Sequence, residues 1–186
     1  MSEHPYTIAV TLIALVLLIA LIWALRRKPK MAAEVAQARA SISAMRRILV
    51  PVRGFVHEER AVELACRLGQ EQKSQIFLLS VIEVPLSLSL GTVLPEQESR
   101  ALEALQRSIE LVKLHGLEPI TRVERDREAG RGILRVATEL NVDVVVIGLD
   151  PLRAVAVDPV GPTTETLLRR ANFEVIVDRP APRPTD

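Results

Sequence analysis

The chain has 186 residues, enough for one globular domain and a further segment. Its formal net charge is only +1, so a general nucleic-acid-binding surface is not expected. The single cysteine, Cys66, excludes a disulfide within the chain, and its position in an apolar helical pattern predicts a buried side chain rather than a reactive thiol.

An uncharged apolar run follows the first five residues and covers Tyr6–Leu25, YTIAVTLIALVLLIALIWAL. As an α-helix this run would be about 30 Å long, which is the thickness of the hydrocarbon core of a bilayer. Tyr6 and Trp23 lie near its two ends, where aromatic side chains favour the membrane interface. The run therefore predicts a single transmembrane helix at residues 6–25, with residues 1–5 on the far side of the membrane.

The charges around the run indicate a retained anchor rather than a cleaved signal peptide. A signal peptide carries positive charge before its apolar region, but here the cations follow it: Arg26, Arg27, Lys28 and Lys30. The positive-inside rule predicts a chain in the cell (inner) membrane with its N-terminus outside and its C-terminal domain in the cytoplasm. Without intramembrane charge, the helix is expected to be a tether or a docking helix. Residues 26–45 are predicted to form a basic juxtamembrane segment and a partly helical stalk.

From residue 46 onward, strand patterns alternate with helix patterns. Apolar runs predict strands at Arg47–Val52, Gln75–Val84, Leu117–Arg125, Val142–Gly148 and Phe173–Arg179. Helices are expected between them, with apolar stripes that include Ala61, Leu64, Ala65 and Leu68 in the first, Leu102, Leu105, Ile109 and Val112 in the second, and Ile133, Val136, Ala137 and Leu140 in the third. A fourth helix is expected at about Thr164–Ala171, and the proline-rich residues 180–186 are predicted to be a disordered tail.

This alternation predicts an α/β fold in which helices cover both faces of a parallel sheet. The continuous β-branched run Val142–Gly148 indicates a strand that is buried on both faces. Ligands of such sheets bind beyond the carboxyl ends of the strands, where the strand order reverses. The loops after Val52 and Gly148 are therefore the candidate site. Pro51 conflicts with a central first strand, because proline lacks a ladder donor.

Three segments resemble the universal stress protein family: ILVPVRGF (Ile48–Phe55), ELNVDVVVIG (Glu139–Gly148) and VGPTTETLLRRANFEVIVDRP (Val160–Pro180). The similarity covers about residues 46–179 and all five predicted strands. It implies a doubly wound five-stranded parallel sheet of order 3-2-1-4-5, and a proline in the first strand is common in that family. Family members commonly dimerise through the last strand, so the resemblance also implies a homodimer as one candidate assembly.

The resemblance further implies a nucleotide-binding loop after the fourth strand. Binders carry Gly, two residues, Gly, nine residues, Gly, and then Ser or Thr. Gly148 and Gly161 match the first and third glycines, whereas Pro151 and Pro162 replace the second glycine and the hydroxyl residue. The aspartate that ends the first strand of binders is Arg53 here. The degenerate nucleotide-binding set is then Val52, Arg53, Gly148, Gly161, Thr163 and Thr164.

Whether this loop binds a nucleotide or only packs is left open by its chemistry. Pro162 lacks the N–H that a phosphate would use, and Pro151 cannot take the positive φ of a glycine. Arg53 cannot accept hydrogen bonds from ribose hydroxyls. It could pair with a phosphate, fill the crevice, or pair with Asp150. The favoured expectation is that no cofactor binds, and ATP or another adenine nucleotide is the alternative.

The sequence contains no catalytic or metal-binding spacing. His4, His57 and His115 are scattered, and acidic pairs such as Glu58–Glu59 are expected to be solvated or to lie at helix N-termini. The favoured function is therefore a non-enzymatic, membrane-anchored accessory or regulatory subunit. Its helix and cytoplasmic domain would dock on a larger membrane protein complex. The alternative is a membrane-tethered adenine-nucleotide sensor that regulates a transporter or channel.

Overall fold

The computed structural model of the chain describes residues 15, 16, 18, 45–150 and 160–179. Its contacts divide the chain into two units, Met1–Ile42 and Ser43–Asp186. In the first unit, Leu15, Val16 and Leu18 are helical and exposed. Several predicted features lie outside the described residues, namely the rest of the span, Tyr6, Trp23, the cations Arg26, Arg27 and Lys28, most of the stalk, and the tail. No helix in the described ranges is long and apolar enough to cross a membrane.

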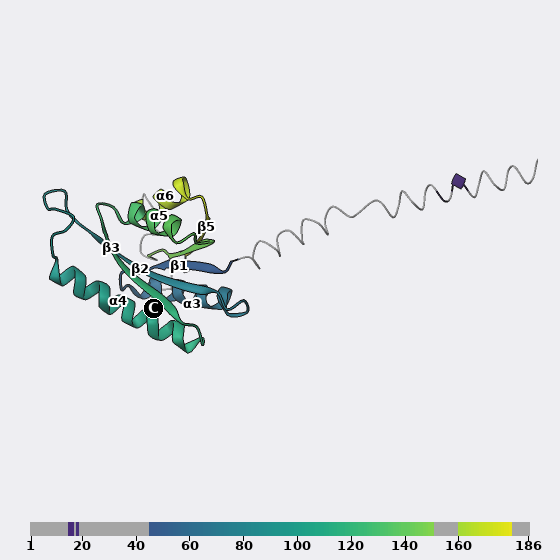
Figure 1. The fold of residues 1–186 in the computed structure, drawn as a ribbon, viewed down its shortest axis with the longest axis horizontal. Helices are drawn as coiled ribbons and strands as arrows, with labels where there is room; N and C mark the ends of the chain where they lie inside the picture. Colours follow the sequence, from purple (N-terminus) through teal and green to yellow (C-terminus); the bar gives the residue numbers. More distant parts are fainter. Residues whose placement is uncertain (1–14, 17, 19–44, 151–159, 180–186) are drawn as a thin grey trace, which may run out of the picture. The chain divides into compact units, whose positions relative to one another are not determined.

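The second unit is an alternating series of strands and helices (Figure 1). The elements in chain order are β1 (Arg47–Pro51), α3 (Val56–Gln70), β2 (Gln75–Glu83), α4 (Pro95–Leu114), β3 (Pro119–Asp126), α5 (Ala129–Glu139), β4 (Val144–Gly148), α6 (Pro162–Arg170) and β5 (Glu174–Asp178). The strands form one parallel sheet of order β3-β2-β1-β4-β5. The predicted α/β class, the doubly wound topology and the strand order are therefore confirmed.

Each face of the sheet has its own hydrophobic core. Alternate residues of a strand point to opposite faces, so Ile48 and Val50 of β1 pack with α3 and α4, while Leu49 packs with α5 and α6. The pattern repeats on β4, where Val144 and Val146 join the first core and Val145 joins the second. These three valines have no exposed surface. The sequence-based expectation of a strand buried on both faces is thus confirmed.

Pro51 lies in β1 without breaking the sheet because of where β1 separates from β4. The pairing of β1 with β2 continues to Pro51 opposite Leu79, but its pairing with β4 ends at Leu49 opposite Val145. Val52 N–H donates to Leu79 O at 2.8 Å, so the backbone position of the preceding residue faces β4. The proline therefore removes a donor only where no ladder partner remains, and this separation opens the carboxyl edge of the sheet.

The prediction for the apolar stripe of α4 was wrong at Leu102, which is 61% exposed. The buried face of the helix consists of Ala101, Ala104, Leu105, Ser108 and Val112. Small residues can occupy the face nearest the sheet, and an apolar pattern counted only on large side chains misses them. In α3, Ala61 and Ala65 are buried as predicted, together with Cys66.

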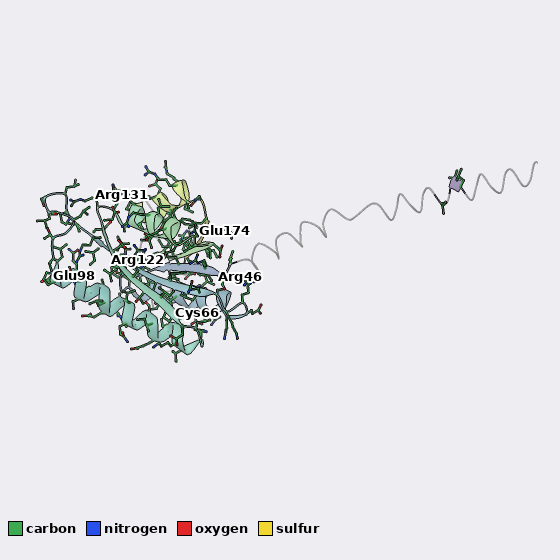
Figure 2. All side chains as sticks on the ribbon, viewed as in Figure 1. Arg46, Cys66, Glu98, Arg122, Arg131 and Glu174 are labelled. Atoms are coloured by element: carbon green, nitrogen blue, oxygen red, sulfur yellow. The ribbon has the colours of Figure 1, made fainter. Side chains whose placement is uncertain are left out.

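Ion pairs join the edge strand β3 to α5, and two of their arginines are labelled in Figure 2. Arg131 Nη2 lies 2.6 Å from Asp126 Oδ1, and Arg135 Nη2 lies 3.0 Å from Glu124 Oε2. Arg122 also pairs with Glu124. Burial raises the pKa of Asp126, but hydrogen bonds from Arg131 and from two backbone N–H groups lower it by more, so the net pKa is depressed. The charged form of Asp126 therefore stabilises the fold.

Asp126→Asn should lower the free energy of unfolding most at neutral pH, by about 1.5–3 kcal/mol for the lost charge-assisted hydrogen bonds. A carboxyl with a depressed pKa contributes stability that is present above its unfolded value of about 4 and is lost as pH falls through the folded value. Denaturant titrations of both proteins at a series of pH values should therefore converge towards acid. A difference that stays constant from neutral to strongly acidic pH contradicts the assigned role of Asp126.

Candidate functional site

A crevice lies at the carboxyl ends of β1 and β4. Its inner part has about 20 Å³ open to a water-sized sphere, room for about one water molecule. Residues of the predicted set that line this part are Val52, Arg53, Gly148 and Thr163. An adjoining outer hollow of about 330 Å³ is bordered in addition by Gly161 and Thr164. The predicted residues thus come together at one edge of the sheet, whereas Pro151, Arg153 and Asp158 lie outside the described residues.

Different structural constraints explain why glycine occupies positions 148 and 161 of the predicted loop. Gly161 precedes α6 with φ 77°, a conformation that glycine adopts without strain. At Gly148, an added Cβ would lie 2.7 Å from the carbonyl oxygen of His57, because the end of β4 packs against the first turn of α3. Close packing alone therefore requires a glycine at Gly148, and a bound phosphate is not needed to explain it.

Glu58 occupies the start of α3 with a buried carboxylate. Its Oε2 atom accepts the backbone N–H groups of Arg53 at 2.5 Å, Gly54 at 2.8 Å and Phe55 at 3.1 Å. The residue is only 5% exposed. Of the two expectations for Glu58, the charge at a helix N-terminus is confirmed and the solvated side chain is not. The available sequence signal was a glutamate three residues after the helix cap, as in a capping box, but the cap here is Phe55 and not the usual Ser or Thr.

The N-termini of α5 and α6 offer few free donors towards the crevice. Glu83, at the end of β2, accepts the backbone N–H of Ala129 at 2.8 Å, the first residue of α5. The first residue of α6 is Pro162, which has no N–H. Helix N-termini bind anions through such N–H groups and the helix dipole. Carboxylates therefore accept the amides that precede α3 and the first amide of α5, and α6 lacks its first amide.

Arg53 lies at the mouth of the crevice, with half of its side chain exposed. Its Nε atom is 3.4 Å from Glu58 Oε1, and its guanidinium carbon lies 5.5 Å from the centre of the Phe55 ring. The Phe55 ring in turn stacks on His57 with ring centres 5.4 Å apart. Of the roles considered for Arg53, an ion pair with a carboxylate is thus seen, with Glu58 as the partner.

The carboxyl edge is further tied together by Asp178 at the end of β5. Arg60 of α3 donates from Nε to both carboxylate oxygens of Asp178, at 2.8 and 3.1 Å. Leu149 N–H donates to the carbonyl oxygen of Asp178 at 2.8 Å. These contacts hold the segment that follows β4 against β5. Gly148 is therefore held by β5 on one side and by α3 on the other.

His115 and Cys66 have structural roles outside the crevice. His115 Nε2 lies 2.6 Å from Glu63 Oε2, and this hydrogen bond lowers the pKa of Glu63. Burial raises the pKa of the Cys66 thiol to about 11, so the thiolate is scarce at neutral pH. Within residues 45–150 and 160–179, no group of three or more His, Cys, Asp or Glu side chains could hold a metal ion.

Comparison with known proteins gives one family match and a set of similar folds. The model of the universal stress protein family matches residues 45–179. The universal stress protein UspA from Lactobacillus plantarum has a similar structure, with TM-score 0.60 and 20% identity over 73% of this chain and 98% of that one. None of the curated protein sequences compared with the chain matches it.

Two further similar structures contain an adenine nucleotide. The universal stress protein from Archaeoglobus fulgidus in complex with dAMP has TM-score 0.58 and 20% identity over 70% of this chain and 95% of that one. A universal stress protein family protein from Arabidopsis thaliana with AMP bound has TM-score 0.54 and 14% identity over 72% of this chain and 90% of that one. At these identities the likeness establishes the fold alone.

Glu58→Ala should destabilise the domain by about 1.5–3 kcal/mol, because it leaves three backbone N–H groups without their charged acceptor. The neighbouring Glu59→Ala is the matched control, since Glu59 lies on the same turn without these contacts, and it should change stability by less than about 0.5 kcal/mol. Chemical denaturation followed by circular dichroism measures both. Equal effects of the two substitutions would show that Glu58 is not the acceptor that holds this loop.

Proposed function

The chain belongs to the universal stress protein family, and we propose that it is a non-enzymatic accessory or regulatory subunit anchored in a membrane. Its domain and its helix would dock on a larger membrane protein complex. The observation that carries this proposal is the occupied crevice edge, where Glu58 takes three amides and Glu83 takes the first amide of α5. A domain that satisfies these groups from its own side chains keeps its shape without a nucleotide.

Electrostatics support the same proposal. Any phosphate placed at this edge would approach the carboxylates of Glu58 and Glu83 and would find no N–H on Pro162. Each lost charge-assisted hydrogen bond weakens binding by about 1.5–3 kcal/mol, which is about tenfold or more in affinity. Arg53 already pairs with Glu58, so its charge is partly neutralised within the protein.

An adenine-nucleotide sensor is the second candidate function, and two observations favour it. The outer hollow of about 330 Å³ lies within the size range of small-molecule sites. In addition, the similar proteins described above were solved with dAMP and with AMP. In this case the binding residues would be Val52, Arg53, Gly148, Gly161, Thr163 and Thr164.

Membrane anchoring is supported by the pattern of the N-terminal sequence. The apolar run Tyr6–Leu25 is followed at once by four cations within residues 26–30. Leu15, Val16 and Leu18, the described residues of that run, are helical and each is more than half exposed. An exposed aliphatic helix is stable in a bilayer and costly in water. The proposed orientation places the N-terminus outside and the family domain in the cytoplasm.

The proposed partner is a membrane protein complex, and a homodimer through β5 is a further proposal. β5 pairs with β4 on one side, and in the described part of the chain no strand covers its other edge. An uncovered edge strand carries backbone donors and acceptors that a second strand can use. The mass of the detergent-extracted protein reports whether a second copy is present.

The accessory proposal, in which the crevice binds no nucleotide, predicts that millimolar ATP, ADP or AMP leaves the thermal unfolding of the detergent-extracted chain unchanged. A ligand at about one hundred times its dissociation constant would add about 2.7 kcal/mol of stability, which a melting experiment detects easily. Inorganic phosphate at the same concentration controls for ionic effects. A nucleotide-specific rise in melting temperature would reject the accessory proposal in favour of the sensor.

The anchor proposal predicts that Leu15→Arg with Leu18→Arg moves the chain out of the membrane fraction. Each arginine near the centre of a spanning helix costs about 2.5–3.5 kcal/mol on insertion scales. Leu114→Arg is the control, because Leu114 is exposed on α4, and this variant should stay in the membrane.

Extraction of the wild-type chain in mild detergent should yield a larger heteromeric complex. A wild-type chain that washes off the membrane, or elutes alone, contradicts the proposal.

A further inference from the structure

The connection between β2 and α4 carries an exposed aliphatic surface. Figure 1 shows this segment projecting past the carboxyl end of the sheet. It reads PLSLSLGTVL, Pro85–Leu94, and contains neither a charged nor an aromatic residue. Leu86 is 88% exposed, Val93 65%, Leu90 43% and Leu88 38%. Aliphatic side chains at alternate positions, separated by serines, thus face water in the isolated domain.

Hydrogen bonds from another segment of the domain hold this loop, residues 85–94, in place. Arg127, from the segment between β3 and α5, donates to three carbonyl oxygens: Val84 at 3.0 Å, Leu88 at 2.8 Å, and Pro85. These three hydrogen bonds fix the backbone of the first half of the loop, up to Leu88. Leu86 and Leu88 are therefore held in a defined arrangement.

The backbone of the loop also satisfies much of its own hydrogen bonding. Leu88 N–H donates to Pro85 O at 3.1 Å, Thr92 N–H donates to Ser89 O at 3.0 Å, and Gly91 N–H reaches Ser89 Oγ at 3.4 Å. A segment that enters an apolar medium must satisfy its polar backbone groups internally, because lipid tails cannot do so. The turns and the Arg127 contacts supply part of that requirement here.

We infer that the loop Pro85–Leu94 inserts its exposed aliphatic side chains into the surface of the lipid bilayer to which the chain is anchored. The inference rests on the proposed N-terminal anchor. It adds a second, reversible membrane contact that would set the orientation of the domain. Because the anchor already holds the domain at a high effective concentration near the lipid, even a weak contact of this kind is populated.

The size and composition of the surface favour lipid over a protein partner. Stable protein interfaces bury about 800 Å² on each side and take most of their energy from Trp, Tyr and Arg. The loop offers four exposed aliphatic side chains and contains none of those three residue types. Lipid tails require only aliphatic surface and no fixed geometry, which is what Leu86, Leu88, Leu90 and Val93 offer.

The connecting chain is long enough for this contact. Figure 2 shows Arg46, where the chain enters the sheet, and Glu98, just after the loop in the sequence, at opposite ends of the domain. Residues 26–44 separate the predicted span from the domain, and they would cover about 30 Å as a helix and about 60 Å when fully extended. A domain of this size has a radius of gyration of about 14 Å. The domain can therefore turn its carboxyl edge towards the bilayer.

The test uses the full chain in vesicles of phosphatidylcholine and phosphatidylglycerol. Leu86→Cys carries an environment-sensitive fluorophore, and Leu114→Cys, also highly exposed at 82%, is the matched control at the other end of α4. The native Cys66 is buried, so the unsubstituted chain gives the labelling background. Quenching by doxyl-labelled lipid and by aqueous iodide is measured for both labels, together with flotation of the vesicles.

The label at position 86 should be quenched about twofold or more strongly by doxyl lipid than the label at position 114, and less strongly by iodide. Adding Leu88→Ser and Leu90→Ser should return the label at position 86 to water without changing flotation. A label at 86 that stays open to iodide in chains that float overturns the loop inference and leaves the anchor intact. Shielding from both quenchers indicates a protein contact and also overturns it. Chains that do not float overturn the anchor, and the inference with it.

Discussion

At the carboxyl ends of the strands of a parallel sheet, strands end and helices begin, and the first N–H groups of those helices need acceptors. In this domain that edge is closed by its own side chains. The Glu58 carboxylate accepts three amides before α3, Glu83 accepts the first amide of α5, and Arg60 pairs with Asp178 at the end of β5. The separation of β1 from β4 at Pro51 leaves room for this arrangement.

At the carboxyl edge, side chains of the domain itself accept the backbone amides. This bears on what membership of the family implies for function. Universal stress proteins of similar fold have been solved with dAMP and AMP. In the present crevice, carboxylates accept the amides before α3 and the first amide of α5, and Pro162 at the start of α6 offers none. A domain that is complete without a ligand suits a role in binding another protein, which is the accessory role proposed here.

The β2–α4 loop is likewise held by hydrogen bonds from a side chain of the domain to its backbone. Arg127 donates hydrogen bonds to backbone carbonyl oxygens of this segment and so fixes the position of its aliphatic side chains. Fixing an apolar surface in water serves no purpose for the stability of an isolated domain. The proposed membrane contacts are thus two aliphatic segments, the apolar run Tyr6–Leu25 and the loop Pro85–Leu94.

The sequence by itself determined the α/β class, the five strands and the location of the crevice, because strand and helix periodicity and the Gly148–Gly161 spacing are local patterns. It misassigned Leu102, since small residues such as Ala101 and Ala104 occupy part of the buried face of α4. It left the role of Glu58 open, since the helix cap at Phe55 is not the usual Ser or Thr. Only the tertiary structure decided that Gly148 serves the packing of β4 on α3 and that Arg127 orders the loop 39 residues away at Leu88. Those contacts join segments far apart in the chain, and the distances between such segments are set by the packed sheet and leave no trace in local sequence.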